Sequence, residues 1–167
     1  MKMLFAFLFF PMISMGQTIH IKNDTIVYEG KEKIPSLTPS EILKRSQDAL
    51  ASIVSNYKNL QTSDHSVTGR GQFKLQTPYD IKRTVSYTIQ ITTTDEGYDF
   101  LIDSVSLKEQ VRGEKSVTKS SAELLDTMGE AGKIVDNTEK ILNEMDMNFQ
   151  KLLAQLKSKL SAAVDQN

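Results

Sequence analysis

The stretch VSYTIQI, residues 85–91, decides the fold because its hydrophobic residues fall on every second position. Its four hydrophobic residues alternate with serine, threonine and glutamine, which is the pattern of a β-strand with one buried face. The connector that follows ends in Gly97, and glycine accepts the left-handed backbone that closes many hairpin turns. The sequence therefore predicts a central two-stranded hairpin that the rest of the chain covers.

The return strand of this hairpin begins at Tyr98 and its pattern is less regular. Its hydrophobic residues change faces, from Phe100 and Ile102 on one side to Val105 and Leu107 on the other. The change predicts either a β-bulge between the two pairs or a sheet that is covered on both faces.

The N-terminus has the features of a secretory signal. Lys2 precedes the apolar run MLFAFLFF at residues 3–10, and the small residues Ser14 and Gly16 suit the outer and inner positions of a cleavage site. The run is shorter than the roughly 20 residues that a membrane-spanning helix needs. We therefore expect residues 1–16 to be a cleaved signal peptide and the mature chain from Gln17 to be periplasmic or extracellular; an uncleaved anchor is the alternative.

Composition excludes several classes of function. The formal net charge of −1 provides no broad positive field for nucleic acid, so we expect no nucleic-acid partner. The chain has no cysteine, which excludes disulfides, thiol catalysis and cysteine-ligated zinc. A length of 167 residues suits one domain with an appended element, and 39% hydrophobic residues suffice for a modest core.

A helix is predicted from Pro39 to about Tyr57. Thr38 and Glu41 form a Thr-x-x-Glu capping box, with Pro39 at the first helical position. From Ile42 onward, hydrophobic residues recur at helical spacing and form one apolar face that needs a sheet to cover.

The order of elements predicts an α+β fold. A short strand near 25–29, the capped helix, a strand over 67–75, the hairpin and a C-terminal helix give a β-α-β-β-β-α order. We expect an antiparallel sheet covered on one face by helices. In this division, residues 17–118 form the domain and residues 119–167 form an amphipathic helical region that packs on the domain or extends from it.

The strand at 67–75 carries two glycines on its hydrophobic face. Glycine within a strand marks a bend, a bulge or a close approach. One interpretation is that the helix or a bulky side chain packs over the bare patch; the other is that a ligand lies there. The candidate ligand-binding residues are Gly69, Arg70, Gly71, Tyr87 and Phe100.

A long helix is predicted at the C-terminus. Ser120 and Glu123 resemble a second capping box, and Gly129 and Gly132 predict a break before a helix over residues 133–163. Such a helix would be roughly 46 Å long, whereas a ten-residue strand reaches about 33 Å. We therefore expect it to overhang its sheet and to offer an apolar face for assembly or for a membrane. The residues of that face are Leu142, Met145, Phe149, Leu152 and Leu156.

The sequence contains no recognisable catalytic or metal-binding motif. Its two histidines have no plausible catalytic neighbours, and His-x-x-x-His is absent. Asp99 and Asp103 share a strand face, but about 13 Å separates such positions, which is too far for joint acid–base work. We expect no catalytic residue, no metal and no cofactor.

Four segments resemble those of a known family: SEIL at 40–43, GRGQF at 69–73, the strand at 85–91, and DEGYDF leading into LIDSV at 95–105. On these segments the chain resembles a domain of unknown function with a TATA-binding-protein-like (TBP-like) fold, typical of secreted Bacteroidota proteins. The resemblance covers about residues 25–107. It implies a sheet with helices on one face, in the cell envelope or outside the cell, and it brings no established active site.

These observations predict an exported, non-enzymatic binding or interaction module that assembles through its C-terminal helix. Its partner would be a second copy or another envelope protein. One alternative is a small-ligand carrier with a pocket between sheet and helix. The other is a peripheral membrane protein that inserts the apolar face of the C-terminal helix beside Lys151, Lys157 and Lys159.

Overall fold

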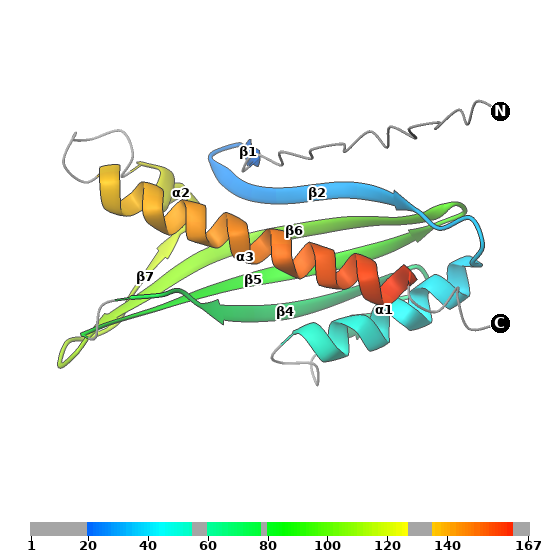
Figure 1. Cartoon of the computed structure of the whole chain (residues 1–167), viewed down its shortest axis with the longest axis horizontal. Helices are drawn as coiled ribbons and strands as arrows, with labels where there is room; N and C mark the ends of the chain where they lie inside the picture. The colour runs from blue at the N-terminus through cyan, green and yellow to red at the C-terminus, as the bar shows by residue number, and fades with distance from the viewer. Residues whose placement is uncertain (1–19, 55–59, 78–79, 127–134, 162–167) are drawn as a thin grey trace, which may run out of the picture.

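One antiparallel sheet and three helices make up the part of the chain that the computed structural model describes, residues 20–54, 60–77, 80–126 and 135–161. The strands are β1 (His20–Lys22), β2 (Thr25–Lys33), β3 (Gln61–Thr62), β4 (Ser66–Lys74), β5 (Ile81–Thr94), β6 (Gly97–Val111) and β7 (Val117–Ser120). The helices are α1 (Pro39–Ile53), α2 (Ser121–Asp126) and α3 (Val135–Ser161). The sheet has the order β1-β2-β6-β5-β4-β3, and β7 also pairs with β6. The predicted α+β architecture is confirmed (Figure 1).

The predicted hairpin is the centre of the sheet. Strands β5 and β6 contain 14 and 15 residues, and they pair along almost their whole length. On β5 every second residue from Arg83 to Thr93 is buried, as the alternating sequence predicted. Both strands are longer than the ten residues expected, and this length changes how the C-terminal helix is accommodated.

A β-bulge interrupts β6, as one of the two interpretations of its pattern expected. Ser86 pairs with Ser106 and Thr88 with Asp103, so that Tyr87 lies opposite two residues of β6. One of the two is Ser104, whose backbone φ is 52°. The extra residue returns the hydrophobic side chains that follow it to the same face as those that precede it.

The N-terminal strand is longer than predicted and has a partner. The segment before Asn23, for which the sequence predicted no strand, contains β1, which pairs antiparallel with β2. Asn23 and Asp24 connect the two strands with φ values of 52° and 57°, a left-handed conformation that these residue types tolerate.

Helix α1 begins as predicted and ends four residues earlier. The Thr38 backbone N–H donates to the Glu41 carboxylate at 2.8 Å, and the Glu41 N–H donates to the Thr38 hydroxyl at 3.4 Å. The helix stops at Ile53, and Val54 is already extended. The predicted end at Tyr57 lies outside the described residues.

Both capping boxes should weaken in acid. The Thr38 backbone N–H, and then its hydroxyl, hold the pKa of Glu41 below its ordinary value of 4.5, and Ser120 does the same for Glu123. Because each pKa is lower in the folded chain, this stabilisation is complete above pH 4.5 and is lost as the pH falls through the lowered value. An NMR titration of the two carboxyl groups should find both pKa values depressed, and Thr38→Val, which removes the hydroxyl but keeps the backbone N–H, should raise the Glu41 pKa part of the way toward 4.5. Ordinary glutamate values in the wild type would contradict the capping geometry.

Helix α3 lies across the sheet on the same face as α1 (Figure 1). Its 27 residues span about 40 Å, whereas the 14 to 15 residues of the central strands span roughly 46–50 Å. The expected overhanging apolar surface is not found in the described part of this helix, because the stripe of apolar residues that runs from Ile141 to Leu160 is buried. Its apolar stripe joins the sheet and α1 in one hydrophobic core. The break predicted at Gly129 and Gly132 falls outside the described residues.

Candidate functional site

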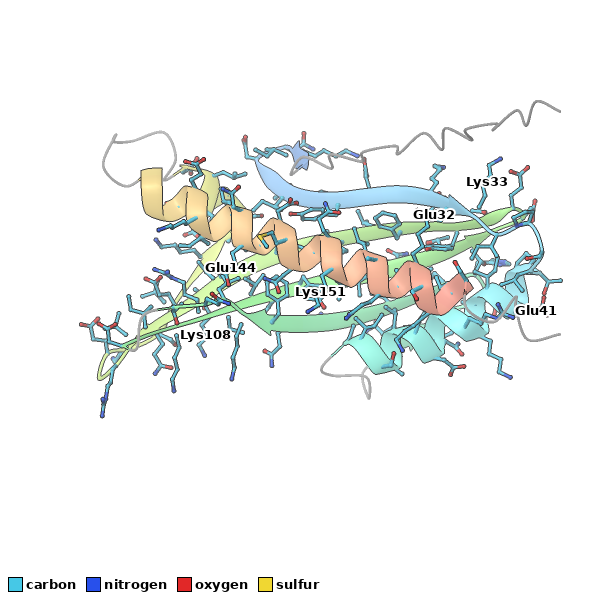
Figure 2. The ribbon with its side chains drawn as sticks, in the orientation of Figure 1. Glu32, Lys33, Glu41, Lys108, Glu144 and Lys151 are labelled. Atoms are coloured by element: carbon cyan, nitrogen blue, oxygen red, sulfur yellow. The ribbon has the colours of Figure 1, made fainter. Side chains whose placement is uncertain are left out.

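A groove of about 920 Å³ runs between the first half of α3 and the sheet where β4 ends and β5 begins. We call it the Arg83 groove. Its sheet side carries Lys74, Gln76 and Arg83, and its α3 side carries Lys140, Glu144, Met147 and Lys151 among others. Glu144 and Lys151 extend from α3 toward this part of the sheet (Figure 2).

The groove exists because the two helices cover the sheet unequally. Helix α1 has only 15 residues and packs beside the C-terminal half of α3, where Arg45 Nη1 donates to the Leu160 carbonyl oxygen at 3.4 Å. At the other end of the sheet, the helix-covered face of β4 and β5 has α3 on one side and no second helix among the described elements (Figure 1). The two strands therefore form an open floor there.

Arg83 is the charged residue on that floor. Its position in the alternating pattern of β5 points it to the helix-covered face, and it is only 8% exposed. Its Nε donates to a Glu109 carboxylate oxygen at 2.5 Å. A guanidinium has five N–H donors, and its terminal nitrogens make no hydrogen bond to any described residue. Arg83 is one of the residues that line the groove, and neither terminal nitrogen is a fully buried atom left without a partner.

Positive charge predominates around the groove. Lys74, Lys140 and Lys151 are exposed, and none forms an ion pair or hydrogen bond within the described ranges. Glu144 is the acidic lining residue, and its carboxylate already accepts the Gln76 backbone N–H at 2.5 Å. A recess with several cations and one engaged carboxylate attracts anions.

Comparison with known proteins establishes the fold. Neither the models of protein families nor the curated proteins contain a match to this chain. Among solved structures, a TBP-like protein from Parabacteroides distasonis superimposes with a TM-score of 0.71 at 13% identity, covering 85% of this chain and 96% of that one. The chain has a TBP-like fold. A DUF4468 family protein from Bacteroides ovatus is also similar, with a TM-score of 0.62 at 14% identity over 86% of this chain and 90% of that one.

The resemblance noticed in the sequence is thus confirmed for the TBP-like fold. At 13% and 14% identity the likeness shows the fold alone. Because a fold does not determine a function, the role of this TBP-like domain has to be argued from its own side chains.

Bulky side chains pack over the two strand glycines of this TBP-like domain. A Cβ atom on Gly71 would lie 2.2 Å from the Tyr87 ring, and one on Gly69 would lie 2.8 Å from the Leu60 side chain. This is the first of the two interpretations of the bare patch. Burial raises the pKa of Tyr87 to about 12, so its hydroxyl stays neutral at physiological pH.

Of the five candidate ligand-binding residues, Arg70, Gly71 and Tyr87 line one shallow recess of about 470 Å³, whereas Gly69 and Phe100 are not among its lining residues. Gly69, Gly71, Tyr87 and Phe100 are on the helix-covered face, whereas Arg70 is exposed on the opposite face. Phe100 pairs with Ile91 on β5 rather than with a residue near Tyr87, and its ring covers Gly30. A ligand bound over the glycines would have to displace the side chains that fill the space, and binding there stays a prediction.

The five residues expected to form an assembly or membrane face are all buried in a single chain. Leu142, Met145, Phe149, Leu152 and Leu156 are each at most 8% exposed. They pack against the sheet of their own TBP-like domain, so a face built from them would require α3 to leave the sheet. No helix in the described parts combines the length and apolar character needed to cross a membrane.

The acidic residues of the hairpin do not gather into a catalytic or metal-binding cluster in the described chain. Asp99 forms an ion pair with Lys31 at 3.1 Å on the face of the sheet that α1 and α3 do not cover. Within the described ranges, no three or more histidine, aspartate or glutamate residues gather as metal ligands would.

The Arg83 groove was not predicted from the sequence. The available signal was Arg83 itself, a charged residue two positions before Val85 on the hydrophobic face of the alternating strand. Such a residue must find a partner or a solvent-filled recess, because a buried unpaired charge is costly. The lysines from α3 gave no signal, since exposed lysines on a helix are common.

Proposed function

We propose that this TBP-like protein is an exported, non-enzymatic binding module and that the Arg83 groove is its binding site. The observation that carries the proposal is the incompletely paired Arg83 guanidinium on the groove floor. The groove volume of about 920 Å³ lies within the roughly 300–1,000 Å³ of ligand pockets in proteins. Exposed Met147 and buried Ile141 add apolar surface beside the polar groups.

The groups around the groove support binding rather than catalysis. Its charged lining residues are lysines, one arginine and Glu144, which the Gln76 N–H already engages. General acid–base catalysis needs a donor and an acceptor poised together near the reacting atoms. Specific turnover in a broad panel of hydrolase and transferase assays would overturn this part of the proposal.

Export rests on the N-terminal segment. The apolar run at 3–10 after Lys2 and the small residues Ser14 and Gly16 support secretion and cleavage. Mass spectrometry of the protein from a fractionated bacterial host should find a periplasmic or extracellular chain that begins at Gln17. An intact chain that starts at Met1 and stays in the cytoplasm would refute export.

Binding in the groove can be tested by a thermal-shift screen of small ligands on residues 17–167. A ligand present at 100 times its Kd stabilises the folded state by about 2.7 kcal/mol, which is readily detected as a higher Tm. Ligands of the groove should lose their effect with Lys151→Glu. They should keep it with Lys108→Glu, the control, because Lys108 is exposed on β6 and does not line the groove (Figure 2). Equal shifts in both variants would place binding elsewhere.

The mature chain should be a monomer. Self-assembly through α3 was proposed because the sequence suggested an exposed apolar face on this helix. In the structure that apolar stripe is buried against the sheet of the same chain. Light scattering coupled to size exclusion on residues 17–167 should give one monomeric mass across a concentration series. A dimer stable to dilution would restore assembly as the better proposal, with a surface other than this stripe as the interface.

A further inference from the structure

Arg83 presents one edge of its guanidinium to a ligand. Glu109 occupies Nε, so the edge formed by the two terminal nitrogens has no partner in the described chain and is available to a ligand in the groove that Arg83 lines. That edge matches two oxygens of a carboxylate or a phosphate, which arginine binds through two parallel N–H···O hydrogen bonds. Arg83 is only 8% exposed, so little water competes for these donors, and an oxyanion that reaches them accepts charge-assisted hydrogen bonds. The site therefore favours an oxyanion.

The charged residues that line the groove have a net positive charge once the carboxylates that already have partners are set aside. Glu109 pairs with Arg83 itself, and Glu144 is engaged by the Gln76 N–H. The remaining charged residues on the α3 side are Lys140 and Lys151, and neither side chain has a partner in the described chain; Lys74 lines the groove from the edge of β4, where it alternates with the core-facing Phe73 and Leu75. These lysines would attract an anion and neutralise charge that Arg83 does not reach.

The groove is too large and too apolar for an inorganic ion alone. Its volume is about 920 Å³, whereas one water molecule occupies about 30 Å³ of liquid. Met147 is 71% exposed beside Ile141 on the α3 wall. Methionine is flexible and polarisable, and it adapts to irregular apolar partners.

We propose that the Arg83 groove binds a small organic anion. Its carboxylate or phosphate is held by the terminal nitrogens of Arg83, with Lys140 and Lys151 beside it, and its apolar part lies against Met147. This inference rests on the proposed function, because it names the ligand class of the same groove. The shared chemistry is an oxyanion head joined to a short apolar tail.

The test uses three probes that share one tail: hexanoate, hexyl phosphate and neutral 1-hexanol. Each is titrated into isotope-labelled residues 17–167, and NMR follows the backbone amides and the arginine Nε–H signals. Hexanoate or hexyl phosphate should shift the Arg83 Nε–H signal and the amides of Lys140 to Lys151, and added salt should weaken that binding. The tighter of the two anions identifies the head group as carboxylate or phosphate.

Variants separate the role of Arg83 from folding. Arg83→Gln should weaken binding of the anion by about tenfold or more, the range expected for hydrogen bonds to a charged group. Because that change also leaves Glu109 without its partner, Lys140→Gln and Lys151→Gln provide exposed substitutions that should each raise the Kd several-fold. Lys82→Gln is the matched control, since Lys82 is exposed on β5 next to Arg83 but does not line the groove.

The outcomes distinguish this inference from the proposed function. Equal binding of 1-hexanol and the two anions in the groove would overturn the anion inference and leave the groove a binding site. Anion binding that Lys140→Gln, Lys151→Gln and Lys82→Gln weaken equally would also overturn it, because it would show non-specific attraction. If neither the probes nor the ligand screen disturbs the groove, the proposed function itself fails.

Discussion

Replacing Phe149 with alanine is expected to lower the free energy of unfolding by about 3–5 kcal/mol, the usual cost of removing a buried phenylalanine. Phe149 is fully buried in the middle of α3. Its ring centroid lies 4.7 Å from that of Tyr28, 5.1 Å from that of Phe73 and 5.3 Å from that of Tyr87. One side chain thus joins α3 to β2, β4 and β5, and each aromatic pair adds about 0.5–1.5 kcal/mol beyond area burial.

Urea unfolding followed by circular dichroism measures this loss. Met147→Ala is the matched control, because Met147 lies two residues away on the same helix and is 71% exposed. That control should stay within about 0.5 kcal/mol of the wild type. A loss of less than about 1.5 kcal/mol for Phe149→Ala would mean that α3 contributes far less to the core than its burial indicates.

Replacing Gly97 with alanine is expected to destabilise the fold by about 3 kcal/mol or more, at the upper end of the range for overpacking. A Cβ atom on Gly97 would lie 1.9 Å from the Glu32 carbonyl oxygen and 2.9 Å from the Lys33 Cα. Both atoms belong to the backbone of β2, which pairs with β6 at this position. No side chain can rotate out of the way, so the two strands must separate at their ends.

Chemical denaturation measures the cost, and hydrogen exchange locates it. The Ile34 amide, which donates to the Glu96 carbonyl at 2.8 Å, should lose protection in Gly97→Ala. Gly113→Ala is the control: a Cβ there meets nothing within 4 Å, and only its φ of 87° opposes the change, at about 1–2 kcal/mol. Gly97 itself has no left-handed backbone, so equal losses at the two glycines would show that the contact between β2 and β6 costs no more than the left-handed φ at Gly113 and would contradict the expected overpacking.

Local patterns in the sequence were sufficient to predict the elements that depend on local physics. The hairpin follows from the alternation of hydrophobic and polar residues around Tyr87. The starts of α1 and α2 follow from Thr38 and Ser120, whose hydroxyls each accept a hydrogen bond from the backbone N–H three residues later. The bulge in β6 was one of two interpretations, since a change of face has two physical explanations. Strand β1 escaped prediction because three residues are too few for a pattern, and its pairing with β2 defines it.

The candidate site was not predictable to the same degree, because it depends on contacts between distant segments. The position of α3 on the sheet depends on strand length, and β5 begins at Ile81, before its clearest alternation. The groove requires α1 to end at Ile53, and α3 to supply Lys140 and Lys151 more than 50 residues after the sheet residue Arg83. No local pattern encodes that juxtaposition.

The extra residue at Ser104 has a consequence for how this strand can change in related chains. It lets a strand of 15 residues keep one hydrophobic face although its hydrophobic residues change from even-numbered to odd-numbered positions at the bulge. Losing that residue would turn Val105 and Leu107 outward and bring serine and lysine inward. In a relative without the extra residue, the hydrophobic residues after this point must therefore be shifted by one position along the strand. A sequence alignment of the two chains without a gap would then pair hydrophobic with polar residues, although the two cores are alike.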